Sequence, residues 1–146
     1  MSAVPELPFV EQVVSGDILL AIIVRNSFSK PGVSFFTSDN LSQQLAFIRH
    51  LPGKLIEPHI HNPVQREVLY TQEVLVIKKG VLRVDFYDNS RAYLESRLLS
   101  AGDVILLAEG GHGFEVLEEL EMIEVKQGPY AGDCDKTKFI RTDENR

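Results

Sequence analysis

Short apolar segments alternate with turn residues along most of the chain, and this alternation constrains the fold more than any other feature. Clusters of Gly, Pro, Asp, Asn and Ser separate the segments at intervals of roughly 8–12 residues, a spacing typical of β-sandwiches and β-barrels. Residues 8–14 are the best candidate for a helix, of one or two turns. The sequence therefore predicts an all-β fold, with strands at residues 18–24, 33–37, 45–48, 74–77, 81–87, 104–107, 114–117 and 122–126.

Length, charge and cysteine content limit the classes of protein to consider. The 146 residues suit one domain, 1–146, with a barrel at about 16–130 and a polar tail at 131–146 that frays from residue 137. The net charge of -6 argues against a nucleic-acid surface and against a polybasic membrane anchor. The chain has one cysteine, Cys134, which we expect to be exposed. Because a single cysteine allows no internal disulfide and no targeting segment is recognisable, we expect a cytoplasmic protein.

Histidines and one glutamate form the most informative chemical pattern. His59 and His61 are two apart, so on a strand both imidazoles would project from the same face. Glu73 begins a strand that we expect to end at Gly80, and His112 follows a pair of glycines. Three imidazoles and one carboxylate are suitable ligands for a divalent metal, although a lone His-x-His pair is also common on solvated strands.

These residues match the motifs of the cupin superfamily. The first cupin motif resembles G-x5-H-x-H-x3,4-E-x6-G, and Gly53, His59, His61, Glu73 and Gly80 fit its two halves. The second motif resembles G-x5-P-x-G-x2-H, and the segment from Gly102 to His112 fits it loosely. The resemblance implies a double-stranded β-helix, or jelly-roll, barrel. It also implies one metal, Fe, Mn, Ni, Co, Cu or Zn, bound inside by His59, His61, Glu73 and His112.

The chain departs from the cupin pattern in two places. Residues 62–72 separate His61 from Glu73, where the family usually has three or four residues. This insert contains Glu67 as an alternative ligand, but only Glu73 has the six-residue spacing to Gly80. Ala108 replaces the proline of the second motif, and His112 comes one residue early.

Two groups within the superfamily look most similar. Residues 109–114 resemble the A-H-G-F segment of dTDP-sugar epimerases, and residues 124–139 resemble small cupins found with lipopolysaccharide O-antigen genes. These likenesses imply a small molecule in the barrel, a sugar or similar metabolite, and an enzyme that isomerises, epimerises or oxygenates it. Glu57 shares strand parity with the histidine pair and is the candidate catalytic acid–base residue. The alternative is a binding or sensing module without turnover.

Further expectations concern the cavity and assembly. Either Arg49 or His50 could face the cavity, and the turn that follows leaves both open. Residues 73–77 are apolar on both faces apart from Glu73, which predicts cover on both sides. Because residues 18–24 also need cover and small cupins are commonly dimers, we expect a homodimer.

Overall fold

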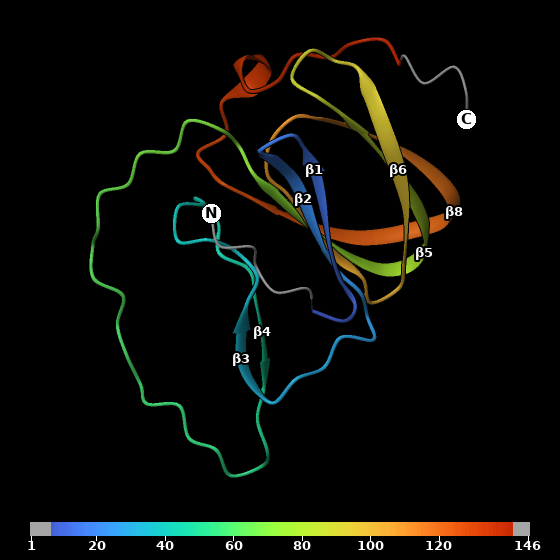
Figure 1. Cartoon of the computed structure of the whole chain (residues 1–146). Coiled ribbons are helices and arrows are strands. Elements are labelled where there is room, and N and C mark those ends of the chain that lie inside the picture. The colour runs from blue at the N-terminus through green and yellow to red at the C-terminus, as the bar shows by residue number, and fades with distance from the viewer. Residues whose placement is uncertain (1–6, 142–146) are drawn as a thin grey trace. The chain divides into compact units, whose positions relative to one another are not determined.

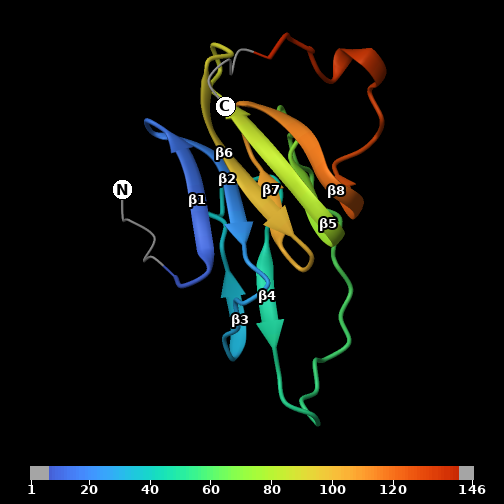
Figure 2. The same cartoon turned by 90° about the vertical axis from the view of Figure 1, so that its right-hand side faces the viewer.

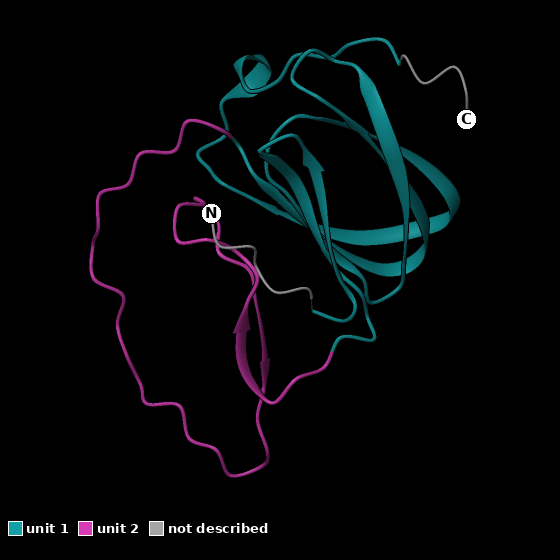
Figure 3. Ribbon diagram, in the orientation of Figure 1, with its two compact units in different colours: residues 1–28, 71–146 teal, residues 29–70 magenta. Residues whose placement is uncertain are grey.

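The computed structural model describes residues 7–141 and divides the chain into two compact units (Figure 3). The larger unit joins the chain up to Phe28 to the chain from Thr71 onward, and the smaller unit is Ser29–Tyr70. No α-helix occurs among the described residues, so the all-β prediction is confirmed at the level of fold class. No helix in this part of the chain has the length and apolar character needed to cross a membrane.

The larger unit is a curled antiparallel sheet that forms a half-barrel (Figures 1 and 2). Its strand order is β1-β2-β7-β5-β6, and β8 pairs with β5 in addition. The single 3-10 turn, η1, follows β8 at Gly132–Cys134. The strands are β1 (Val10–Ser15), β2 (Ile18–Val24), β5 (Glu73–Tyr87), β6 (Tyr93–Ser100), β7 (Val104–Leu107) and β8 (Gly111–Lys126).

The long strand β5 bends near its middle, and β8 bends with it. Gly80 was expected to end this strand, but it lies within β5 at a φ of +89°. The pairing of β5 with β8 shifts register on both sides of this glycine, as bulges do. As a result, each pair of strands predicted on either side, 74–77 with 81–87 and 114–117 with 122–126, forms one continuous strand.

The core fills the inside of the curl. On β5, Leu75 and Ile77 before the bend and Leu82, Val84 and Phe86 after it are 0–1% exposed and belong to one apolar cluster. The cluster also receives side chains from the other strands. Full burial of each such side chain stabilises the fold by roughly 1.5–3 kcal/mol. Burial of apolar side chains from both halves of β5 in one core therefore favours the bent form of the sheet.

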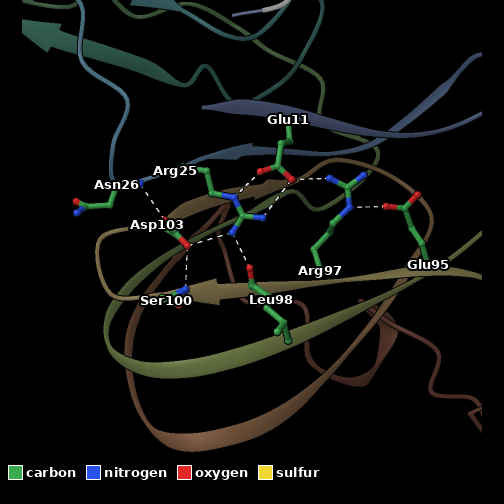
Figure 4. A network of polar contacts seen from close by, with 8 residues as sticks. All are labelled: Glu11, Arg25, Asn26, Glu95, Arg97, Leu98, Ser100 and Asp103. Carbon is green, nitrogen blue, oxygen red and sulfur yellow. Dashed lines mark hydrogen bonds and ion pairs between the residues drawn. The ribbon is translucent and has the colours of Figure 1, made fainter. Parts of the chain in front are cut away.

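Ion pairs link the two end strands of this sheet (Figure 4). Glu11 on β1 accepts hydrogen bonds from Arg25 Nε at 2.5 Å and from Arg97 Nη1, on β6, at 2.5 Å. Arg25 also donates to the Leu98 carbonyl at 2.6 Å and to Asp103 Oδ2 at 3.1 Å. Side chains thus connect β1 to β6, which the backbone ladder leaves at opposite ends of the strand order.

Two parts of the larger unit differ from the sequence-based expectations. Residues 8–14 are not helical, because β1 starts at Val10 and pairs with β2. Strand β6 was not predicted at all, since its charged residues interrupt the apolar pattern. Those charges, Glu95 and Arg97, bind each other at 2.6 Å and extend the network around Glu11.

The C-terminal tail is also more ordered than expected. The Phe139 ring packs edge-on against the Tyr87 ring at 5.1 Å between centroids. Arg141 pairs with Asp85, which is 0% exposed and also accepts hydrogen bonds from Arg83 and Ser96. The expected fraying is therefore wrong for residues 137–141, and residues 142–146 lie outside the described part. Cys134 is exposed, as expected.

The smaller unit contains one antiparallel hairpin, β3 (Gly32–Phe35) with β4 (Ala46–Arg49). Its loop is held by Gln44, which accepts from Thr37 Oγ1 at 2.7 Å and donates to the Ser38 carbonyl at 2.9 Å. Val33 lies opposite Ile48, and these side chains are 53% and 57% exposed. Residues 50–70 follow without a helix or strand, so the smaller unit has little regular structure of its own.

The network around Glu11 predicts a pH-dependent contribution to stability. Hydrogen bonds from Arg25 lower the pKa of Glu11 below its usual value, against the opposing effect of burial, and Arg97 lowers it further. A carboxyl whose pKa falls on folding stabilises the protein above its unfolded pKa, and this contribution is lost as the pH falls through the folded pKa. We expect Glu11→Gln to lower the free energy of unfolding by roughly 1–3 kcal/mol near neutral pH, with the difference shrinking in acid.

Urea unfolding between about pH 3 and 7 measures this difference. Glu119→Gln is the matched control, because Glu119 pairs with Lys79 at 2.7 Å but its side chain is 82% exposed. Its effect should stay within about 0.5 kcal/mol. A Glu11→Gln effect that is independent of pH would contradict the assigned role of the carboxylate.

Candidate metal centre

The bend in β5 brings Glu73 and His112 together inside the larger unit. Glu73 is the first residue of β5, whereas His112 lies opposite Phe86, near the other end of the same strand. In a flat sheet these positions would be about 40 Å apart, at roughly 3.3 Å per residue. Instead, Glu73 Oε2 lies 3.4 Å from His112 Nε2. The curl of the sheet thus brings together two of the four predicted ligands, Glu73 and His112.

The surroundings of Glu73 favour its charged form. A hydrogen bond from His112 and the positive charges of Lys126 and Lys136 lower the pKa of Glu73, and burial opposes them. Lys126 Nζ lies 3.8 Å from Glu73 Oε1, and only 16% of the Glu73 side chain is exposed. An ionised, largely shielded carboxylate is the form that binds a divalent cation.

The turn before β8 fixes the position of His112. Gly110 has a φ of +77°, and a Cβ at this residue would overlap the Leu20 side chain. A Cβ on Gly111 would lie 3.0 Å from the Phe139 ring. Phe114, two residues beyond His112, faces the same side, and its ring centroid is 5.4 Å from that of His112. Close packing therefore explains the glycine pair that precedes the histidine.

The other two predicted ligands lie in the smaller unit. The rings of His59 and His61 are 5.1 Å apart between centroids, so the two imidazoles are neighbours. The segment is not a strand, and the predicted strand geometry is wrong here. His59 Nδ1 lies 2.9 Å from the Glu57 carbonyl oxygen. Because a carbonyl can only accept, Nδ1 is the donor of this contact, and in the neutral imidazole Nε2 would be the acceptor nitrogen.

The predicted ligands therefore occur as two pairs, one in each unit. Across residues 7–141, no group of three or more His, Cys, Asp or Glu side chains is gathered closely enough to hold a metal. The predicted catalytic residue Glu57 and the alternative ligand Glu67 belong to the smaller unit and are exposed. So are Arg49 and His50, and Arg49 donates to Ser29 Oγ at 2.8 Å.

Lys126 is the neighbour of this site that sequence reasoning missed. Phe114 is two residues from His112, and its ring lies beside the imidazole, as strand parity predicts. Lys126 was not considered, because its position opposite Glu73 depends on the pairing of β5 with β8. Only a prediction of that register, across a long stretch of intervening chain, could have identified it.

Comparison with known proteins does not assign the chain to a family. No protein-family model, curated protein or solved structure matches it. The likeness to cupins therefore depends on the sequence motifs alone. Within the larger unit, the structure shows the contact of Glu73 with His112.

Gly80 provides a direct test of how the site is built. A Cβ at this position would overlap the carbonyl oxygen of Glu119 on β8, and the residue also has a positive φ. We expect Gly80→Ala to lower the free energy of unfolding by about 2–4 kcal/mol, because strain and a backbone clash add together.

Gly16→Ala is the matched control for this substitution. Gly16 also has a positive φ, +59°, but nothing lies within 4 Å of an added Cβ. Its expected cost is about 1–2 kcal/mol, from the backbone conformation alone. If urea unfolding shows the same decrease in the free energy of unfolding for both variants, the contact of an added Cβ at Gly80 with β8 does not contribute to the cost.

Proposed function

We propose that this chain is a metal-binding protein of the cupin type, in which His59, His61, Glu73 and His112 together bind one divalent transition metal. The observation that carries the proposal is the approach of Glu73 to His112 across the bend of β5. A separation of 3.4 Å is one that two ligand atoms of a single ion can span when each bond is about 2.0–2.2 Å.

The donor set and its protonation fit such an ion. Three imidazole nitrogens and one carboxylate suit Fe, Mn, Ni, Co, Cu or Zn, and the set contains no thiolate. The lowered pKa of Glu73 keeps its carboxylate charged. The contact of His59 Nδ1 with the Glu57 carbonyl suits a neutral imidazole that binds a metal through Nε2, because metal-bound histidines commonly donate their other N–H to a carbonyl.

The proposed architecture is a jelly-roll barrel to which both units contribute. The larger unit supplies a half-barrel with an apolar interior. Binding of one metal by all four ligands would bring the histidine pair to Glu73 and His112. It agrees with the exposed apolar side chains of the smaller unit, such as Leu55 at 86% and Ile60 at 89%, which need cover.

The ligand we propose is a small polar metabolite, such as a sugar with neighbouring hydroxyl and carbonyl groups. A bound metal would supply Lewis acidity to such a group. Within the chain, Phe114 would form an apolar wall beside His112, and Glu57 is the candidate to move a proton. The alternative, binding or sensing without turnover, needs the same ligands but not Glu57.

Metal analysis of the purified protein tests the ligand set. We expect about one equivalent of a transition metal per chain, and its loss in the His59→Ala/His61→Ala double variant. Unchanged metal content in that variant would disprove the site. Because both histidines are exposed, the substitutions should leave the fold intact.

The carboxylate ligand is tested by a matched pair of variants. Glu73→Gln should reduce metal affinity at least about 10-fold, whereas Glu67→Gln should leave it unchanged. The reverse result would assign the ligand to residues 62–72 and refute the motif alignment. Circular dichroism of both variants separates loss of the ligand from loss of the fold.

A further inference from the structure

Residues 135–139, which follow η1, are fixed to the larger unit at both of their ends, and we call them the strap. At the start of the strap, Asp135 Oδ1 accepts a hydrogen bond from Thr71 Oγ1 at 2.5 Å. At its end, the Phe139 ring packs edge-on against the Tyr87 ring, with 5.1 Å between centroids. In Figure 1 the strap follows η1 along the upper edge of the larger unit. Side chains therefore hold this segment, although it is not part of a strand.

The two anchors of the strap lie beside the two predicted ligands of the larger unit. Thr71 is two residues before Glu73, the first residue of β5. Gly111 directly precedes His112, and a Cβ at Gly111 would lie 3.0 Å from the Phe139 ring. The strap therefore runs from the vicinity of Glu73 to that of His112, which are themselves 3.4 Å apart.

Two lysines bring positive charge to this pair. Lys126, the last residue of β8, lies opposite Glu73, and its Nζ is 3.8 Å from Glu73 Oε1. Gln127 Oε1 accepts a hydrogen bond from the Gln72 N–H at 2.8 Å, which fixes the chain just beyond Lys126. Lys136 follows the first anchor of the strap, and its charge also acts on the Glu73 carboxylate. The end of β8 and the strap thus each contribute one ammonium group to the same site.

The electrostatic field at Glu73 is positive, in a chain whose net charge is -6. The side chains that shift the pKa of this carboxyl most are His112, Lys126 and Lys136; all three lower it, and burial opposes them. Glu124 competes for Lys126 at 3.6 Å, but its side chain is 42% exposed and solvent screens its charge. A positive field in a partly shielded site attracts and orients an anion.

We propose that Lys126 and Lys136 bind an oxyanion of the ligand, a carboxylate or a phosphate, beside the Glu73–His112 pair, so that the protein takes an acidic rather than a neutral metabolite. Lysine ammonium groups suit this role, because they are point charges that bind either oxyanion. Phe139 is a positioning residue, which acts through Lys136 by fixing the strap. That the oxyanion belongs to the ligand of a metal centre rests on the proposed function; the anion site itself does not.

Anion binding by the full chain, freed of metal with a chelator, tests the site directly. Inorganic phosphate and malonate carry similar charge slightly above neutral pH, and both are titrated at constant ionic strength. NMR shifts of the lysine side chains should show saturable binding with a dissociation constant of roughly 1–10 mM. The anion that binds more tightly identifies the oxyanion as phosphate or carboxylate. If neither anion binds saturably, the proposal is overturned.

A matched pair of double variants tests which lysines bind the anion. Lys126→Gln/Lys136→Gln should weaken binding by about 10-fold or more. Lys79→Gln/Lys138→Gln removes the same charge and should change the affinity less than about 2-fold. Lys79 pairs with Glu119 at the bend of β5, and Lys138 lies on the strap itself. Equal weakening by the two double variants would mean that only overall charge matters, and would overturn the proposal.

Glu73→Gln should have the opposite effect on the metal-free protein. It removes the carboxylate that competes with the anion for Lys126, so phosphate binding should tighten by about 3-fold or more. Unchanged or weaker binding would show that Lys126 does not contact the anion.

A double-mutant cycle tests the role of the strap. Phe139→Ala should weaken anion binding by about 3-fold or more, whereas Ile140→Ala should not, because the Ile140 side chain is 88% exposed. In a Lys136→Gln background, Phe139→Ala should cause no further loss, since it acts through this lysine. Additive losses would refute Phe139 as a positioning residue for Lys136.

Co²⁺ binding separates this inference from the proposed function. Lys126→Gln/Lys136→Gln should bind Co²⁺ at least as tightly as the wild type, because neither lysine is a proposed metal ligand. A wild-type protein that binds Co²⁺ but neither anion overturns the anion site alone. A wild-type protein that binds phosphate or malonate but no Co²⁺ refutes the proposed function and supports the anion site.

Discussion

The bend of β5 at Gly80 is the constraint on which the rest of the larger unit depends. Without it, the two ends of β5 would lie far apart and the apolar residues on either side of the bend could not share one core. The glycine is needed because its Cα approaches the backbone of β8, where any side chain would meet the Glu119 carbonyl. One position without a side chain thus determines both the core and the separation of Glu73 from His112.

The curl also explains the placement of charge in this unit. Strands β1 and β6 are far apart in the strand order, yet Glu11 and Arg97 meet at 2.5 Å. Backbone hydrogen bonds do not join these strands, so side chains with long reach connect them. Arg25 suits this role because its planar guanidinium donates to Glu11, Leu98 and Asp103 at once. Polar residues that obscure the strand pattern of β6 therefore serve the closure of the sheet.

The apolar pattern of the sequence predicted where several strands lie, but it did not predict which neighbouring segments join into one continuous strand. Strands β2 and β7 begin and end where their apolar patterns do, since turn residues flank them. Gly80 is ambiguous, because a glycine within an apolar pattern indicates either the end of a strand or a bulge. The same limit applies to the site. Spacing selected Glu73 and His112, which do meet, but Lys126 and the docking of Phe139 depend on long-range pairing that no local pattern encodes.

The strand order has a further consequence for how the protein is made. Strand β2 pairs with β1 immediately, but its other neighbour is β7, and that ladder joins Ala21 to Leu107. At ribosomal rates of about 5–20 residues per second, roughly 4–17 s pass between the synthesis of the two partners. The ladder between β2 and β7 therefore cannot form until the intervening chain has been made, and the edge of β2 that β7 covers stays unpaired until then.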